Sequence, residues 1–269
     1  MSLFERIGRL SVNGAREANE RLALLGESVV CALSLLIHPR RFRFRDFLLA
    51  FQRAGYGGLP ITICIGFLLG VILAFQTASV LKSFGVETFV ANMLSIALFR
   101  ELGPIITAVI LAGRTGSSFA AEIGTMKVNE ELDALTTMGL PPVRFLVLPR
   151  VAAAIAAMPV LTIFAELSGL VGGAIVLQVM GVPTVVFWRG VATSTTAFMV
   201  CEGLCKGAFF GLLVGLIGCQ SGLRTGSSSD SVGVAATSAV VGGIVAIAIS
   251  DGVLAVLGNI WDVGSSVQL

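Results

Sequence analysis

The chain has 269 residues, of which 55% are hydrophobic and only 13% are charged, and its mean hydropathy is +0.94. A soluble domain carries roughly 25% charged residues, so this composition excludes an ordinary soluble protein and indicates one integral membrane domain. The formal net charge of +2 is uninformative as a total, and the distribution of the charges along the chain carries the information.

Residues 1–53 are predicted to form an N-terminal amphipathic segment ahead of a membrane domain at 54–269. Apolar residues recur in this segment at helical spacing, and polar residues interrupt every long apolar run. The run from His38 to Phe47 interleaves arginine with phenylalanine, which is typical of a helix at the headgroup level of an anionic leaflet. Positive charge flanking the first membrane span explains the same arginines equally well.

Apolar segments long enough to cross roughly 30 Å of hydrocarbon follow. We predict five spans, over about 59–81, 89–112, 151–179, 198–218 and 234–257. A long loop region is expected at 113–149, an interfacial turn at 181–195 and a polar, Gly/Ser-rich loop at 220–231. The predicted fold class is an all-α integral membrane protein with an N-terminal interfacial helix and five transmembrane helices.

Lysine and arginine are distributed unequally between the segments that connect the spans. The N-terminal segment is rich in arginine and the 113–149 region carries further basic residues, whereas the loops after the first and third spans hold only Lys82 and Arg189. Basic residues concentrate in cytoplasmic segments. We therefore expect the N-terminus and the 113–149 region in the cytoplasm and, after five spans, the C-terminus in the periplasm.

Charged residues also occur inside the predicted spans, where each costs roughly 2.5 to 3.5 kcal/mol on insertion scales. Glu202 and Lys206 have the i,i+4 spacing and order of a favourable helix ion pair. A buried network that fixes helix register is one interpretation, and a polar patch lining a transport cavity is the other, which the cost of desolvation favours. The proposed charge network consists of Arg100, Glu101, Glu202, Lys206 and Asp251.

Adjacent residues Arg100 and Glu101 project about 100° apart on a helix and so cannot simply neutralise each other. They need partners on other helices, for which Lys206 and Asp251 are candidates.

The fourth predicted span has a stripe of glycines at a spacing of four, which lets another backbone or a lipid tail approach closely. Helix packing within the monomer is the favoured interpretation, with a lipid groove or a dimer contact as alternatives. The stripe consists of Gly203, Gly207, Gly211 and Gly215.

A short amphipathic helix is predicted from Val128 to Met138, ended by Gly139 and the Pro141-Pro142 pair. Such a helix at a membrane face suits docking into a groove on a soluble partner. Lying flat on lipid is the alternative, which acidic residues disfavour on an anionic leaflet. One face is acidic and the other apolar: Glu130, Glu131 and Asp133 against Leu132, Leu135 and Met138.

No G-x-x-x-x-G-K-[ST] phosphate-binding loop and no His/Cys metal motif occurs in the sequence, which has a single histidine. We expect no catalytic activity, cofactor or metal in this chain, and no nucleic-acid partner. If ATP drives its function, the ATPase, with its ATP and Mg²⁺, is another polypeptide.

The run RELGPIITAVILAGRTGSSFAAEIGTMKVNEELDALTTMGLPPVRFLVLPR, from Arg100 to Arg150, resembles the MlaE/YrbE family of ABC transporter permeases. The motifs at 100–104 and 121–126 carry the resemblance most densely. It implies an N-terminal interfacial helix, five spans and a homodimer in the bacterial inner membrane. The implied partners are a cytoplasmic ABC ATPase, an MCE-domain protein and, in some systems, a STAS-domain protein, and the implied function is transport of phospholipid between the inner membrane and the outer envelope.

The resemblance also implies roles for residues. By position, 128–138 is the coupling helix that docks on the ATPase. Arg100, Glu101, Lys206 and Asp251 match charged positions of the family's lipid cavity. The coupling region is expected to include Glu122, Lys127, Glu130, Glu131, Asp133, Leu135 and Met138.

Two rival functions are also compatible with the sequence. An ATP-independent carrier or channel would use the charge network as an ion path, and it would need an inverted repeat or broken helices. A membrane scaffold that only recruits soluble partners would have no use for charges inside its spans.

Overall fold

The computed structural model describes residues 43–266 and is helical throughout, with no β-strand in that range. Five helical stretches are long and apolar enough to cross a membrane: Phe44–Lys82, Val90–Val128, Val143–Val179, Ala197–Leu223 and Ser229–Gly258. The predicted all-α fold with five spans is therefore confirmed. The predicted interfacial segment lies outside the described residues, apart from 43–53.

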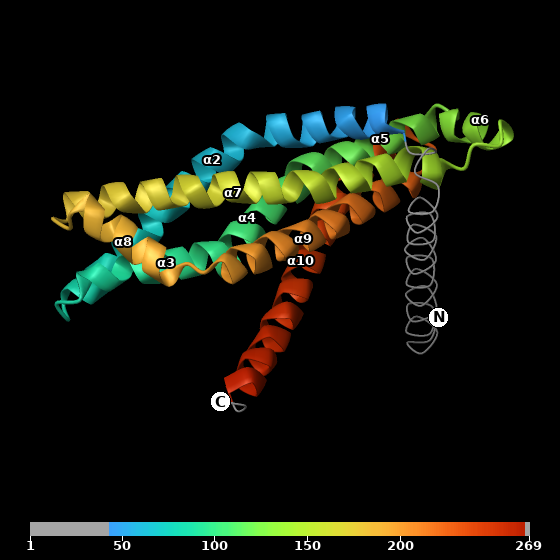
Figure 1. Ribbon diagram of the computed structural model, residues 1–269. Coiled ribbons are helices and arrows are strands. Elements are labelled where there is room, and N and C mark those ends of the chain that lie inside the picture. Colours follow the sequence, from blue (N-terminus) through green and yellow to red (C-terminus); the bar gives the residue numbers. More distant parts are fainter. Residues whose placement is uncertain (1–42, 267–269) are drawn as a thin grey trace, which may run out of the picture.

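The elements follow one another along the chain as the colours of Figure 1 do. The short elements are the 3₁₀ turn η2 and the π-helical segments η3, η4 and η5. In order they are α2 (Phe44–Lys82), η2 (Glu87–Phe89), α3 (Val90–Ala97), η3 (Leu98–Leu102), α4 (Gly103–Leu111), η4 (Ala112–Gly116), α5 (Ser117–Val128), α6 (Glu131–Thr137), η5 (Val143–Val147), α7 (Leu148–Val179), α8 (Thr184–Ser194), α9 (Ala197–Leu223) and α10 (Ser229–Ser266).

The predicted loop at 113–149 is wrong over its first part, because the second span continues as helix through η4 and α5 to Val128. The small residues of η4 and α5, which suggest a loop, instead allow these segments to pack closely against a neighbouring helix. A Cβ added to Gly218 of α9 would lie 2.7 Å from the carbonyl oxygen of Gly116. Contact between the two backbones therefore keeps this segment helical against its weak local propensity.

The predicted turn at 181–195 is also wrong, because α8 is a helix of three turns in length. Its Phe187 is buried, and a Cβ on Gly190 would lie 2.8 Å from Oδ1 of Asn92 in α3. Packing against α3 thus stabilises a helix that its Thr- and Gly-containing sequence does not predict. The loop predicted at 220–231 is shorter than expected, since α9 ends at Leu223 and α10 begins at Ser229.

Helices α2 and α7 pack with their backbones in contact. A Cβ on Gly70 would lie 1.9 Å from the carbonyl oxygen of Gly169, and one on Gly172 would lie 2.4 Å from the carbonyl oxygen of Phe67. Glycines on both helices allow this approach, which lets the dispersion contacts and weak hydrogen bonds that hold membrane helices together form along the seam.

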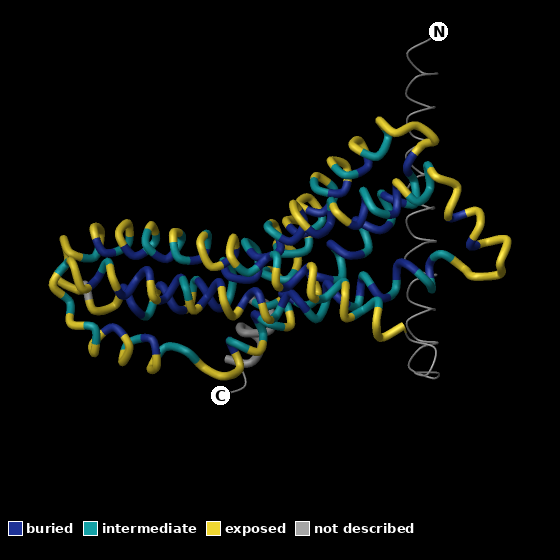
Figure 2. The backbone as a smooth tube through the Cα atoms, turned by 90° about the horizontal axis from the view of Figure 1, so that it is seen from above, coloured by how far each residue is buried: buried dark blue, intermediate teal, exposed yellow. Residues whose placement is uncertain are grey.

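Buried side chains form two clusters, and buried positions recur along the whole length of the bundle (Figure 2). One cluster joins α6 and η5 to α5, α7 and α9, and the other joins α3 and α8 to α2 and α7. Helix α10 diverges from the other spans (Figure 1). Only 11% of the residues in its most apolar stretch are buried, against 61% in the third span. Helix α10 therefore presents most of its apolar surface to the surroundings of the monomer.

Candidate functional sites

A cluster of opposite charges joins three helices well inside the spans. The ammonium of Lys206, on α9, pairs with the carboxylate of Glu101 on η3 and, at 2.5 Å, with Oδ1 of Asp251 on α10. The Lys206 side chain is only 8% exposed. Two carboxylates from neighbouring helices therefore compensate the desolvation of one buried ammonium, as charges inside a membrane require.

The predicted helix pair between Glu202 and Lys206 does not form. Glu202 is half-buried and makes no ion pair within the described part of the chain, although its spacing is favourable. The reason is tertiary: Glu101 and Asp251 already occupy the Lys206 ammonium. Glu202 is thus a member of the predicted network that the structure does not bring into this ion-pair cluster.

Arg100 lies beside this cluster and extends toward α10, since a Cβ on Gly258 would lie 3.9 Å from its Nη2. It shares the π-helical segment η3 with Glu101. The structure therefore brings Glu101, Lys206 and Asp251 together from one π-helical segment and two spans, whereas the Arg100 guanidinium lies near Gly258, about two helical turns beyond Asp251 on α10.

Sequence reasoning missed the π-helical segments, which recur in proteins at functional sites. For η3 and η5 a signal is present in the sequence, because Pro104 and Pro149 stand in the first turns of α4 and α7, directly after these two segments. Proline has no N–H to bond the carbonyl four residues earlier, and its ring crowds that carbonyl. Those carbonyls belong to Arg100 and Phe145, so each proline favours a widened turn at its place.

The glycine stripe of α9 packs within the chain. A Cβ on Gly203 would lie 2.1 Å from the carbonyl oxygen of Phe99, and Cβ atoms on Gly207, Gly211 and Gly215 would all approach atoms of α7 within 3.2 Å. This approach brings α9 against η3, and so places Lys206 within reach of Glu101.

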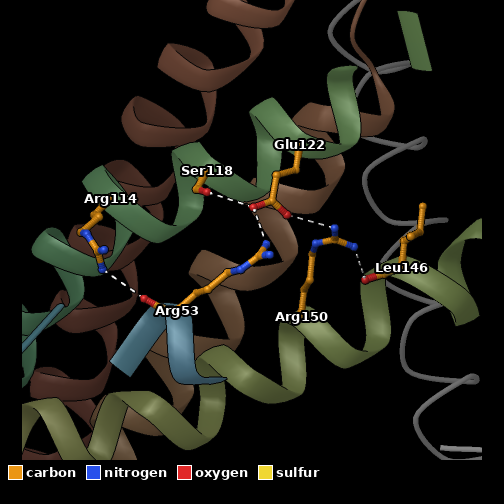
Figure 3. A network of polar contacts seen from close by, with 6 residues as sticks. All are labelled: Arg53, Arg114, Ser118, Glu122, Leu146 and Arg150. Atoms are coloured by element: carbon orange, nitrogen blue, oxygen red, sulfur yellow. Dashed lines mark hydrogen bonds and ion pairs between the residues drawn. The ribbon is translucent and has the colours of Figure 1, made fainter. Parts of the chain in front are cut away.

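A second polar cluster lies where α2, α5 and α7 meet (Figure 3). Glu122 pairs with Arg150 at 3.0 Å and with Arg53 at 3.4 Å, and it accepts a hydrogen bond from Ser118 Oγ at 3.3 Å. Arg114 donates to the carbonyl oxygen of Arg53 at 3.2 Å. Glu122, which the resemblance assigns to ATPase coupling, thus ties three helices of its own chain together.

Lys127 is also engaged within the chain. Its Nζ donates a hydrogen bond of 2.7 Å to the carbonyl oxygen of Leu223, the last residue of α9. Carbonyl groups in the last turn of a helix have no partner in the helix itself, and a basic side chain commonly satisfies them. Lys127 therefore caps α9.

The short acidic helix begins later than predicted. Val128 ends α5, Glu130 has a left-handed backbone with φ of 60°, and α6 runs from Glu131 to Thr137. Leu132 and Leu135 are buried in the cluster at this end of the bundle, whereas Asp133 is exposed. The exposed members of the predicted coupling set are Glu130, Glu131, Asp133 and Met138.

Within residues 43–266, no group of three His, Cys, Asp or Glu side chains is placed to hold a metal ion. Cys201 and Cys205 are exposed on α9.

These features define a multi-pass helical membrane protein with a charge cluster inside its spans and a short acidic helix at one end. The family of the MlaE permease matches residues 47–257, and the chain belongs to that family. A probable ABC transporter permease protein of Rickettsia typhi is 39% identical over 203 residues, 73% of this chain and 76% of the relative. One from Synechocystis is 36% identical over 212 residues, 78% of this chain and 81% of the relative.

The chloroplast protein TRIGALACTOSYLDIACYLGLYCEROL 1 of Arabidopsis thaliana is 31% identical over 221 residues, which cover 82% of this chain and 63% of that protein. The chain is therefore a permease subunit of an ABC transporter, which is not itself the ATPase and works with a separate ATPase.

Proposed function

We propose that this permease moves phospholipid between the inner membrane and the outer envelope of a bacterium, as part of an ATP-driven system with an MCE-domain protein. The observation that carries the proposal is the cluster of Glu101, Lys206 and Asp251 inside apolar spans. A phospholipid needs charge for its phosphate and apolar walls for its acyl chains. The name of the Arabidopsis relative, which is that of a glycolipid, supports a lipid substrate.

Two copies of the chain form the transport cavity at their interface. The largely exposed apolar surface of α10 supports this arrangement, because a second copy or lipid must cover it in a membrane. Arg100 or Lys206 meets the lipid phosphate. Since Lys206 already holds two carboxylates, an incoming phosphate competes with Glu101 or Asp251, and binding of lipid is thereby linked to the contact between α9 and α10.

The end of the bundle that bears α6 faces the cytoplasm. Most basic residues of the described spans lie at this end, whereas Lys82 is the last residue of α2 and Arg189 belongs to α8, which lies at the opposite end of the bundle (Figure 1). The ATPase docks on the exposed acidic residues of α6. Leu132 and Leu135 anchor α6 in the buried cluster, so movement of the ATPase is transmitted to α5, α7 and α9.

Extraction in mild detergent, with mass spectrometry of the proteins and lipids that co-purify, tests this function. We expect an ABC ATPase, an MCE-domain protein and stoichiometric phospholipid, with a STAS-domain protein in addition if the system has one. Transport of lipid by the chain alone, without ATP, would favour a carrier or channel. Recovery with unrelated soluble proteins and no enriched lipid would favour a scaffold.

A further inference from the structure

A cleft of about 490 Å³ opens beside the second polar cluster, between the first turns of α2, helix α5 and the start of α7. Its wall combines three arginines with apolar side chains and contains no member of the Lys206 cluster. The arginines are Arg53, Arg114 and Arg150, and the largest apolar residues are Phe119 and Phe145.

The cleft carries an excess of positive charge. Its two acidic residues are Glu122, shared between Arg53 and Arg150, and Asp46, which pairs at 2.8 Å with Arg43. A guanidinium has five N–H donors, yet within the described residues Arg114 donates one hydrogen bond, to the carbonyl oxygen of Arg53. The Arg53 side chain is 71% exposed, and its contact with Glu122 is long, at 3.4 Å. Donors of both arginines are thus available to a further acceptor.

The position of the Arg114 side chain depends on a glycine in α2. A Cβ on Gly57 would lie 1.9 Å from Nη2 of Arg114, so the guanidinium lies directly on the backbone of α2. Arg114 comes from the π-helical segment η4, and Arg150 is held at 3.1 Å by the carbonyl oxygen of Leu146 in η5. The π-helical segments η4 and η5, together with Gly57, therefore position Arg114 and Arg150 at the same cleft. Figure 3 shows these arginines with Arg53.

The surroundings of the cleft are suited to an amphiphile. The elements that line it meet toward the end of the bundle that bears α6 (Figure 1), and Phe44 and Leu48 in the first turns of α2 are exposed, as is Tyr56 further along the same helix. Arginine and aromatic residues at the end of a span mark the depth of the lipid headgroups. An acyl chain can follow the exposed apolar residues at the start of α2, such as Phe44 and Leu48, while a phosphate binds the guanidinium groups.

We propose that this cleft binds the phosphate headgroup of an anionic phospholipid from the surrounding leaflet, and that the bound lipid joins α2 to α5 and α7. This lipid is a resident of the site and is distinct from the transported one. An acidic segment of a soluble partner is the competing occupant, but the apolar wall and the exposed apolar residues of α2 favour a lipid.

Native mass spectrometry of the full chain, reconstituted with phosphatidylglycerol or with zwitterionic phosphatidylcholine, tests the proposal. The charge variant is Arg53→Gln with Arg114→Gln, and its matched control is Arg189→Gln, an exposed arginine at the other end of the bundle. Gly57→Ala is a second variant that keeps every charge. Alanine favours the helix, so this change moves the Arg114 guanidinium without disrupting α2.

We expect the wild-type chain and Arg189→Gln to retain phosphatidylglycerol in preference to phosphatidylcholine. Because each arginine near a membrane surface contributes about 1 kcal/mol to binding of anionic lipid, the double variant should bind phosphatidylglycerol about thirtyfold more weakly. Gly57→Ala should weaken it severalfold.

Equal retention of phosphatidylglycerol by the double variant and the wild type would overturn the proposal. Displacement of the lipid by millimolar inorganic phosphate would assign the cleft to a soluble anion instead. Unchanged lipid retention with loss of the co-purifying ATPase would assign it to a protein contact.

Discussion

The ammonium of Lys206 and the carboxylate of Asp251 lie 2.5 Å apart and connect α9 to α10, the span that is otherwise least packed against its neighbours. A polar contact between spans gains from the low dielectric of the membrane interior, where an unpaired charge is costly. Lys206 also holds Glu101, so one residue sets the position of both η3 and α10 relative to α9.

Replacing Lys206 should therefore lower the free energy of unfolding far more than replacing Glu202 on the same helix. Lys206→Met leaves two carboxylates without their cation, and loss of one partner from a buried ion pair typically costs about 3–5 kcal/mol. Glu202→Gln should change stability by less than about 0.5 kcal/mol. Thermal denaturation in detergent measures the two variants side by side, and similar losses for both would show that the cluster does not hold the spans together.

Asp251→Asn should separate stability from transport. It removes one of the two carboxylates that pair with Lys206 and leaves Glu101 in place. The chain should therefore fold, and its stability should fall by less than that of Lys206→Met. Lipid transport by the reconstituted complex should fall severalfold, because the contact between α9 and α10 no longer depends on the charge of Asp251. A normal transport rate with a folded complex would contradict the role given to this pair.

The seam between α2 and α7 should not accept a single added carbon at Gly70. Its Cβ would lie 1.9 Å from the carbonyl oxygen of Gly169, so Gly70→Ala must push the two backbones apart. We expect the free energy of unfolding to fall by about 1–3 kcal/mol, as for an overpacked core. Gly233→Ala in α10 is the matched control, since nothing lies within 4 Å of its Cβ. The control should be neutral or stabilising by up to about 1 kcal/mol. Thermal denaturation compares them, and equal stability would show that the seam can open freely.

Reversing the charges of Glu131 and Asp133 to lysine should weaken binding of the ATPase and leave the permease folded, because both side chains are exposed. Asp230→Lys is the control, as an exposed acidic residue near the same end of the bundle but outside α6. Leu135→Ala should act differently and destabilise the chain by about 2–4 kcal/mol, since Leu135 is buried. Co-purification of the ATPase is the measurement, and full recovery with the charge-reversed α6 would remove α6 as the docking element.

Glu130 is the only non-glycine residue between 43 and 266 with a positive φ. A left-handed backbone costs roughly 1–2 kcal/mol for a residue with a Cβ and little for glycine. Glu130→Gly should therefore raise the stability of the link between α5 and α6 by up to about 1 kcal/mol, whereas Glu130→Gln, which removes the charge but keeps the Cβ, should not. Hydrogen exchange of α6 amides reports this local stability, and equal exchange in the two variants would refute the strain.

The sequence alone determined the features that depend on composition along the chain. Hydropathy is a local property, so five apolar stretches predict five spans, and charges such as Arg100 and Lys206 stand out inside them. Proline and glycine at 139–142 likewise mark the end of the acidic helix.

Only the tertiary structure decided which partners these residues have. Lys206 selects Glu101 and Asp251 over the nearby Glu202, and Glu122 and Lys127 bind groups of their own chain. Leu135 belongs to the buried cluster, and contact with α9 keeps 113–128 helical. Each of these outcomes depends on atoms brought together from distant parts of the chain, where packing and desolvation outweigh the local preferences that a sequence displays.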